Sequence, residues 1–182
     1  MSHGKVTSVD LQPAVSPVDL FERRLLHGGS RWIADLTEFF RNYRVDDTEF
    51  ALYAKGKTRT SGFLMSRFIA WTVLPNYAVG LFCVDEADSS LTMEKLRKRM
   101  DAVTKISERE EFHWAWLIVF SDKNIGSGLV SFVTRYDKKE LGLAIASTLS
   151  GQIVLSDSQV GRAIGTQLGL SKALEGHQTR RD

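Results

Sequence analysis

The chain of 182 residues is poor in cysteine and lacks a long apolar segment. Its single cysteine, Cys83, excludes an internal disulfide, and its four histidines have no ligand spacing, which excludes a structural zinc site. No apolar run reaches the roughly 18 residues of a membrane span, and no apolar segment flanked by basic residues marks a secretion signal. We therefore expect a cytoplasmic protein without a membrane partner.

A strong net charge is also missing. The formal net charge of +2 excludes a histone-like protein that binds nucleic acid through bulk charge alone. Apolar residues make up 43% and charged residues 25%, a composition typical of a globular domain. We expect one domain over residues 16–174, flanked by a flexible arm, 1–15, and a flexible tail, 175–182.

Capping residues and apolar spacing predict the helices. Ser16 and Pro17 favour a helix start, because serine caps the free N–H groups and proline suits the first helical position. From Trp32 to Tyr43 apolar residues recur at three- and four-residue steps, the spacing of one buried helical face. The expected helices are Ser16 to Gly28, Ser30 to Tyr43, Leu91 to Lys105, Gly126 to Tyr136, and Ser156 or Ser158 to Leu174.

Alternation and short apolar runs predict the strands. Glu49 to Lys55 alternates as a half-buried strand does, whereas Tyr77 to Val84 and Trp114 to Phe120 are nearly continuous apolar runs. With 63–74 as its middle strand, the first part of the sheet is expected to be a three-stranded meander. Two further strands, 141–146 and 152–155, complete an α/β fold with three layers, a mixed sheet flanked by helices.

The order helix, meander, helix, strand over Ser30 to Leu155 resembles the restriction-endonuclease-like fold of the PD-(D/E)xK nucleases. Val79 to Asp85 stands where that family has its catalytic strand, and Tyr136 to Ile145 is similar to its late helix-to-strand segment. The resemblance implies a magnesium ion held by an acid on the second strand and an acid-x-lysine motif on the third. Here Cys83 occupies the place of the acid and Asp85 that of the lysine.

A thiol is a poor ligand for a hard cation, and a carboxylate cannot replace the lysine. The resemblance therefore implies a degenerate member of the superfamily that cuts nothing and needs no cofactor. The leading interpretation is a non-catalytic protein that binds DNA or serves as a subunit of a protein complex. The residues expected to contact phosphate are Lys57, Arg59, Arg67, Lys95, Lys98 and Arg99. Because acids are interspersed with these residues, a merely solvated helix surface remains an alternative.

A divergent Mg²⁺-dependent endonuclease is a second interpretation. Its candidate acids would converge on one edge of the sheet. They are Glu38 on the expected second helix, Asp47 or Glu49 at the start of the first strand, and Asp85 or Glu86 at the end of the third. Lys95 or Lys98 would supply the cation. Against it, acids at strand ends commonly face solvent, and Asp46-Asp47 has the composition of a turn.

Two further patterns suggest contact surfaces. Gly161, Gly165 and Gly169 would line one stripe of the last helix, where close backbone approach within the domain or across a homodimer could offset the low helix propensity of glycine. A structural homo-oligomer is therefore the third interpretation. Trp114 and Trp116 alternate along a strand and share one face, so they either stack a base or a partner side chain or pack within the sheet.

Overall fold

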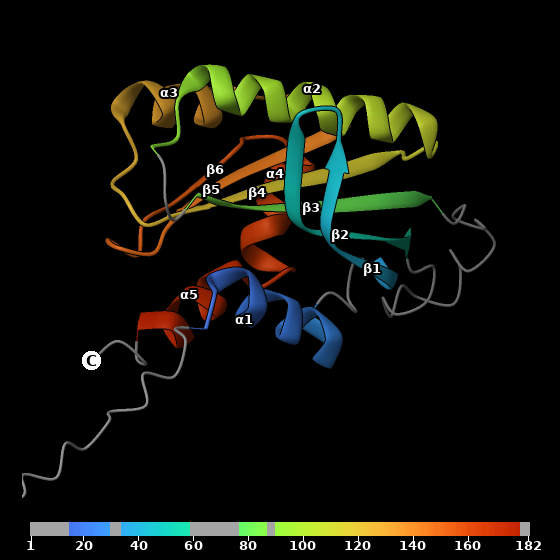
Figure 1. Ribbon diagram of the computed structural model, residues 1–182, viewed down its shortest axis with the longest axis horizontal. Coiled ribbons are helices and arrows are strands. Elements are labelled where there is room, and N and C mark those ends of the chain that lie inside the picture. Colours follow the sequence, from blue (N-terminus) through green and yellow to red (C-terminus); the bar gives the residue numbers. More distant parts are fainter. Residues whose placement is uncertain (1–14, 30–33, 59–76, 87–89, 179–182) are drawn as a thin grey trace, which may run out of the picture.

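The computed structural model describes residues 15–29, 34–58, 77–86 and 90–178. These residues form an α/β protein, in which one mixed six-stranded sheet lies between two layers of helices (Figure 1). The strands lie in the sheet in the order in which they occur along the chain: β1 (Ala34–Val45), β2 (Thr48–Thr58), β3 (Ala78–Glu86), β4 (Trp114–Ser121), β5 (Leu141–Ser147) and β6 (Ile153–Leu155).

The sheet combines an antiparallel and a parallel half. β1, β2 and β3 form an antiparallel meander, β3, β4 and β5 are parallel, and β6 is antiparallel to β5. Parallel neighbours need a crossover connection. Here α2 (Met93–Arg109) and α3 (Ser127–Arg135) provide the crossovers, and both cover the same face of the sheet. The opposite face is covered by α1 (Pro17–Arg24), α4 (Gln159–Thr166) and α5 (Leu170–Gln178).

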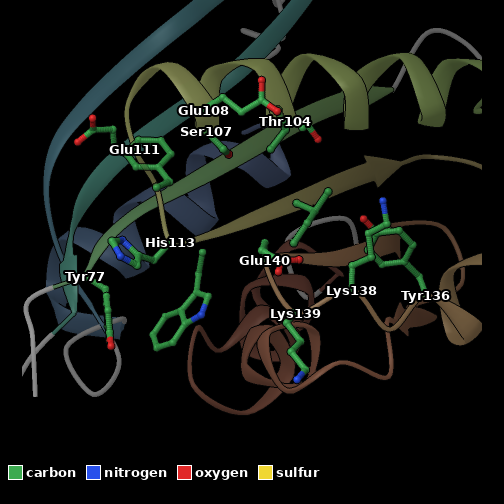
Figure 2. Close-up of a pocket in the computed structure, with 14 residues that line it drawn as sticks. Tyr77, Thr104, Ser107, Glu108, Glu111, His113, Tyr136, Lys138, Lys139 and Glu140 are labelled. Atoms are coloured by element: carbon green, nitrogen blue, oxygen red, sulfur yellow. The ribbon is translucent and has the colours of Figure 1, made fainter.

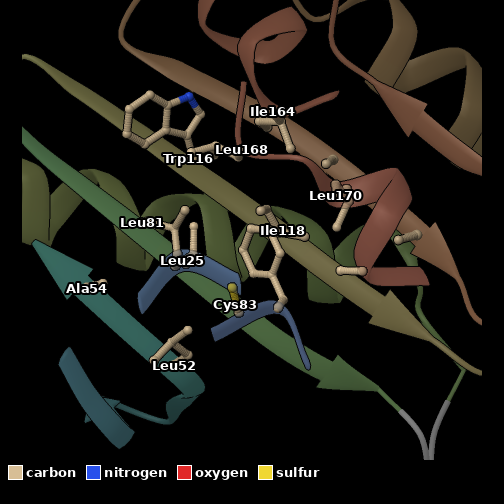
Figure 3. Packing of buried hydrophobic residues seen from close by; sticks show 14 of the residues in the cluster. Leu25, Leu52, Ala54, Leu81, Cys83, Trp116, Ile118, Ile164, Leu168 and Leu170 are labelled. Atoms are coloured by element: carbon tan, nitrogen blue, oxygen red, sulfur yellow. The ribbon is translucent and has the colours of Figure 1, made fainter. Parts of the chain in front are cut away.

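Each face of the sheet has its own apolar core. Leu81, Cys83 and Trp116 pack beneath α1, α4 and α5 (Figure 3), whereas Phe82 and Leu117 pack beneath α2 and α3. All five are 0% exposed. A parallel strand covered on both faces becomes nearly continuous in apolar residues. This burial explains why the runs of β3 and β4 could be recognised in the sequence.

The expected helix over 30–43 is wrong, because 34–45 form strand β1. Two irregularities in β1 explain the misleading spacing. The β1–β2 register shifts between Leu36 and Glu38, and Asn42 has a left-handed φ of 50°. An extra residue in a strand brings positions three apart onto one face. Leu36 and Phe39 consequently share one face, and Phe40 and Tyr43 both contact the ring of Tyr53.

The meander exists, but with different strands from those expected. Its members are β1, β2 and β3, whereas the expected middle strand, 63–74, lies outside the described residues. Asp46 and Asp47 form the β1–β2 turn, as their composition predicted, since Val45 pairs with Thr48.

The starts of the helices agree with the prediction from capping residues better than their ends do. The Ser16 side chain caps α1 by accepting the N–H of Val18, at 3.2 Å. The expected single C-terminal helix is two helices, α4 and α5, separated at Gly169, which has a left-handed φ of 68°. No helix among the described ranges is long and apolar enough to cross a bilayer.

Candidate functional site

Cys83 lies in the middle of β3, where the resemblance would place a catalytic acid. Its side chain is 0% exposed and is surrounded by apolar residues of β2, β4 and α1 (Figure 3). Burial raises the pKa of the Cys83 thiol, because the low-dielectric core disfavours the thiolate. A buried neutral thiol cannot bind magnesium or act as a nucleophile, so Cys83 is a core residue.

Asp85 follows on the same face of β3 and is engaged in holding α1. The Ser16 hydroxyl donates a hydrogen bond to Asp85 Oδ2 at 2.7 Å and also accepts the N–H of Val18. Asp85 thereby orients the residue that caps the first helix. This contact ties the helix layer to β3 at the position where the resemblance would place a lysine.

Four of the five acids proposed for a nuclease line one cavity. The carboxyl-end cavity, of about 520 Å³, lies at the end of β3 and is bordered by Asp47, Glu49, Asp85 and Glu86. Crevices outside the carboxyl ends of parallel strands commonly bind ligands. Glu38 does not join them, because it lies on β1, where its carboxylate is 3.4 Å from Lys55 Nζ.

The acids of the carboxyl-end cavity are matched by cations. Asp47 lies 3.5 Å from Lys98, and Glu49 lies 2.6 Å from Arg44. Among the described residues, no three His, Cys, Asp or Glu side chains come close enough together to hold a metal ion. The cavity is therefore lined by ion pairs and contains no assembled set of metal ligands.

A buried ion pair forms one wall of this cavity. Glu86, at the end of β3, is 4% exposed and pairs with Arg99, which is 13% exposed, while Lys95 lies 3.5 Å away. Burial lowers the pKa of Arg99 to about 10, so its guanidinium stays charged at neutral pH. Because the guanidinium of Arg99 pairs with the buried carboxylate of Glu86, it joins α2 to β3 and is poorly placed to contact a phosphate.

The other expected phosphate contacts are divided between two ends of the sheet. Lys95 and Lys98 lie on α2 beside the end of β3, whereas exposed Lys57 lies on β2 opposite Ala78, the first residue of β3. Arg59 and Arg67 lie outside the described residues. The described members of the set therefore do not form one continuous surface.

The glycines of the expected interface pack against their own chain. A Cβ on Gly161 would lie 2.0 Å from Ser156 Oγ, and one on Gly165 would lie 2.7 Å from Leu155 Cδ1. Gly169 lies in the turn after α4, with Arg24 beside it. These close approaches explain why glycine is used there without a second subunit.

A larger cavity lies at the opposite edge of the sheet, and the sequence did not reveal it. The amino-end cavity, of about 790 Å³, is bordered by Tyr77, Trp114 and Leu141, which stand at the start of β3, β4 and β5 (Figure 2). The centroid of the Tyr77 ring lies 4.5 Å from that of His113 and 5.5 Å from that of Trp114. The Tyr77 ring is tilted by 47° against the His113 ring and by 51° against the Trp114 ring, so the three rings form an aromatic cluster at the edge of the sheet.

The two tryptophans of β4 therefore have different roles. Trp116 is 0% exposed, and its indole N–H donates to the Val160 carbonyl at 2.9 Å. Trp114 is partly exposed and borders both the amino-end cavity and a neighbouring hollow of about 720 Å³. Of the two tryptophans, Trp114 has accessible surface, whereas Trp116 packs within the sheet, one of the two alternatives that the alternation left open.

The comparisons with known proteins add no relative. A scan against protein-family models finds no match, and a search of curated proteins finds none.

Proposed function

We propose that this chain is a non-catalytic nucleic-acid-binding protein on a restriction-endonuclease-like scaffold. The scaffold is supported by the antiparallel meander followed by a parallel strand, with α2 as the crossover between β3 and β4. The helices on both faces agree with this arrangement.

The observation that carries the non-catalytic part is the chemistry of β3. At the position of the metal-binding acid stands Cys83, buried and protonated, and at the position of the lysine stands Asp85, bonded to Ser16. A hard divalent cation needs several oxygen ligands at short range. This strand offers two carboxylates, and both already have structural partners: Asp85 is bonded to Ser16, and Glu86 is paired with Arg99.

The nucleic-acid part is supported by exposed cations near both cavities. Lys98 is 57% exposed beside the carboxyl-end cavity, while Lys57, Lys138 and Lys139 are exposed towards the other edge. Lysines that contact phosphate release counterions, so their contribution is measured by the salt dependence of binding.

The test is anisotropy of labelled single-stranded and duplex oligonucleotides at increasing salt. We expect binding that weakens steeply between about 50 and 200 mM salt. Lys57→Gln should lower the salt slope by about one, whereas the matched change Lys172→Gln, at an exposed position of α5, should leave it unchanged. A chain that binds neither form, or binds without salt dependence, would instead fit a subunit of a protein assembly.

A divergent Mg²⁺-dependent nuclease is the second candidate, favoured by one observation. Asp47, Glu49 and Asp85 border the same cavity as Lys95 and Lys98. Incubation of plasmid with the protein in Mg²⁺ or Mn²⁺ separates the two candidates. Cleavage that disappears in Asp47→Asn, a variant that leaves the Ser16 contact intact, would establish the nuclease and overturn the non-catalytic function.

The homo-oligomer remains a proposal without support from the glycine stripe. Gly165→Leu would collide with Leu155 of the same chain, so a change of mass in that variant would be ambiguous. Light scattering of the wild-type protein over a concentration series is the better test. A constant monomeric mass would end the proposal.

A further inference from the structure

The amino-end cavity has rigid walls. Phe112 N–H donates to the Ser107 carbonyl at 2.8 Å, which closes the end of α2, and His113 N–H donates to the Ala78 carbonyl at 2.9 Å. Ala115 N–H donates to the Glu140 carbonyl at 2.8 Å. These bonds fix the backbone on three sides of a space whose volume, about 790 Å³, lies within the range of small-molecule sites.

One wall of the cavity is aromatic and accessible. Tyr77 is held by its backbone N–H, which donates to Thr58 Oγ1 at 3.1 Å, and its ring contacts the rings of His113 and Trp114. Tyr77 and Trp114 are partly exposed and His113 is exposed. Planar rings fixed at the rim of a cavity provide a surface on which another planar ring can stack.

The other walls carry charges of both signs. Glu108 and Glu111 come from the end of α2, whereas Lys138, Lys139 and a third acid, Glu140, come from the connection between α3 and β5 (Figure 2). Within the described part of the chain, none of these five side chains forms an ion pair or a hydrogen bond. The buried Ser107 hydroxyl on the same wall as the glutamates also has no partner there.

This combination selects the class of ligand. A simple cation would suit the rings and the glutamates but would be repelled by the lysines, and a simple anion would meet the opposite conflict. A nucleotide satisfies all three walls, because it has a planar base, amino groups that donate hydrogen bonds, and an anionic phosphate. Unpaired bases are recognised in this way, by stacking on aromatic side chains and by hydrogen bonds to their exposed edges.

We infer that the amino-end cavity binds one unpaired nucleotide, with its base stacked on the Tyr77–His113–Trp114 cluster, its amino edge towards Glu108 and its phosphate at Lys139. The inference rests on the proposed nucleic-acid function and adds to it a site and a preference for single strands. A duplex, whose bases are stacked and paired, would engage only the lysines.

The test compares three ligands by isothermal titration calorimetry: single-stranded oligonucleotides, the matching duplex, and the four mononucleotides. We expect single strands to bind more tightly than the duplex. Trp114→Leu should weaken single-strand binding about tenfold or more, whereas Trp114→Phe, which keeps a ring, should retain most of it. Circular dichroism verifies that both variants are folded.

Exposed Lys139 provides a second variant that does not depend on the packing of Trp114. Lys139→Gln should lower the salt slope by about one for single strands, and Lys172→Gln should not. Unchanged single-strand affinity in both Trp114→Leu and Lys139→Gln would overturn the site while leaving nucleic-acid binding elsewhere on the chain intact.

Other outcomes distinguish the site from the function. Mononucleotides that bind in a Trp114-dependent manner while strands do not bind would support the cavity chemistry and overturn the nucleic-acid function. No binding of any nucleotide or strand by the wild-type protein would overturn both. Trimethylated lysine peptides that bind where nucleotides do not would overturn the inference in favour of a cation site.

Discussion

Tyr53 on β2 is buried among aromatic rings and has a hydroxyl group without a hydrogen-bond partner in the described residues. Its ring stacks on Phe82, with centroids 4.8 Å apart, and on Phe40, with centroids 5.3 Å apart. A buried hydroxyl that has lost its hydrogen bonds to water costs about 1–3 kcal/mol. The ring of Tyr53 stabilises the fold, whereas its oxygen opposes it.

Replacement of this tyrosine by phenylalanine should therefore be stabilising. We expect Tyr53→Phe to raise the free energy of unfolding by about 1 kcal/mol, measured by urea denaturation. The control is Tyr43→Phe, which removes the hydrogen bond from Arg109 Nη2 to Tyr43 Oη, 2.7 Å long, at an exposed site. That change should lower stability slightly, and a loss in Tyr53→Phe would show that its hydroxyl has a partner after all.

Buried thiol and phenol groups predict how the free energy of unfolding depends on pH. Burial raises the pKa values of the Cys83 thiol and the Tyr53 phenol, and raises the pKa of Tyr136 to about 12. In the unfolded chain these groups have pKa values of about 8.5 for a thiol and 10 for a phenol. The native state then binds more protons than the unfolded state, so stability is full at lower pH and falls as the pH rises.

Urea unfolding at pH 7, 9 and 10.5 should show a progressive loss of stability. The loss should be smaller in Tyr53→Phe, because that variant removes one of the three groups responsible. A free energy of unfolding that stays constant across this range would contradict the assigned burial.

At the scale of elements, two glycines near the C-terminal end of the fold have opposite effects on stability: Gly169, just before α5, and Gly176, within it. Gly169 separates α4 from α5 with φ of 68°, and an added Cβ would lie 2.3 Å from Arg24 Nε. Gly176 lies within α5, and a Cβ there would meet nothing within 4 Å. Gly169 needs glycine because its backbone conformation is left-handed. At Gly176, glycine only lowers the helix propensity of α5.

Alanine substitution at the two positions should give opposite results. Gly169→Ala should lower the free energy of unfolding by more than about 1 kcal/mol, because left-handed backbone strains an L-residue and Arg24 must move. Gly176→Ala should raise it by about 0.5–1 kcal/mol. Thermal denaturation followed by circular dichroism measures both, and equal effects would show that α4 and α5 are not divided at Gly169.

Element prediction succeeded where the decisive signal was local. The Ser16 cap and the apolar runs of β3 and β4 depend on neighbouring residues, and they were recognised. β1 was mistaken for a helix because apolar residues recur at three- and four-residue steps in it; its single register shift, between Leu36 and Glu38, and the left-handed φ of Asn42 accompany this spacing. Pairing with β2, which is not visible in a local window, determines the conformation of that segment.

At the scale of the whole molecule, two apolar cores share the strands of one sheet. Leu117 and Ile118 are neighbours on β4, both 0% exposed, and they belong to opposite cores. Since the same strand supports both faces, neither core can form without it.

Leu117→Ala and Ile118→Ala should each lower stability by about 2–5 kcal/mol. In both variants we expect one cooperative transition, with the near-ultraviolet and far-ultraviolet signals changing together. Transitions that separate, with one face unfolding before the other, would contradict a single unit.

The candidate sites were only partly predictable. Asp47, Glu49 and Asp85 were expected at one edge because strand ends in a sheet lie side by side, and they line one cavity. Glu38 was expected in that group because 30–43 was predicted to be a helix. The residue lies on strand β1 instead, where its carboxylate is beside Lys55. The amino-end cavity was missed, because its walls come from segments far apart in the chain; His113-Trp114 was its only sequence signal.

The sequence by itself determined the class of fold and the buried strands, because these depend on residue type and short-range spacing. Only the tertiary structure decided that β1 is a strand, that the glycines pack against their own chain, and that Tyr77, His113 and Trp114 meet. Such contacts arise from pairings between distant segments, whose free energy is gained only when the sheet is assembled.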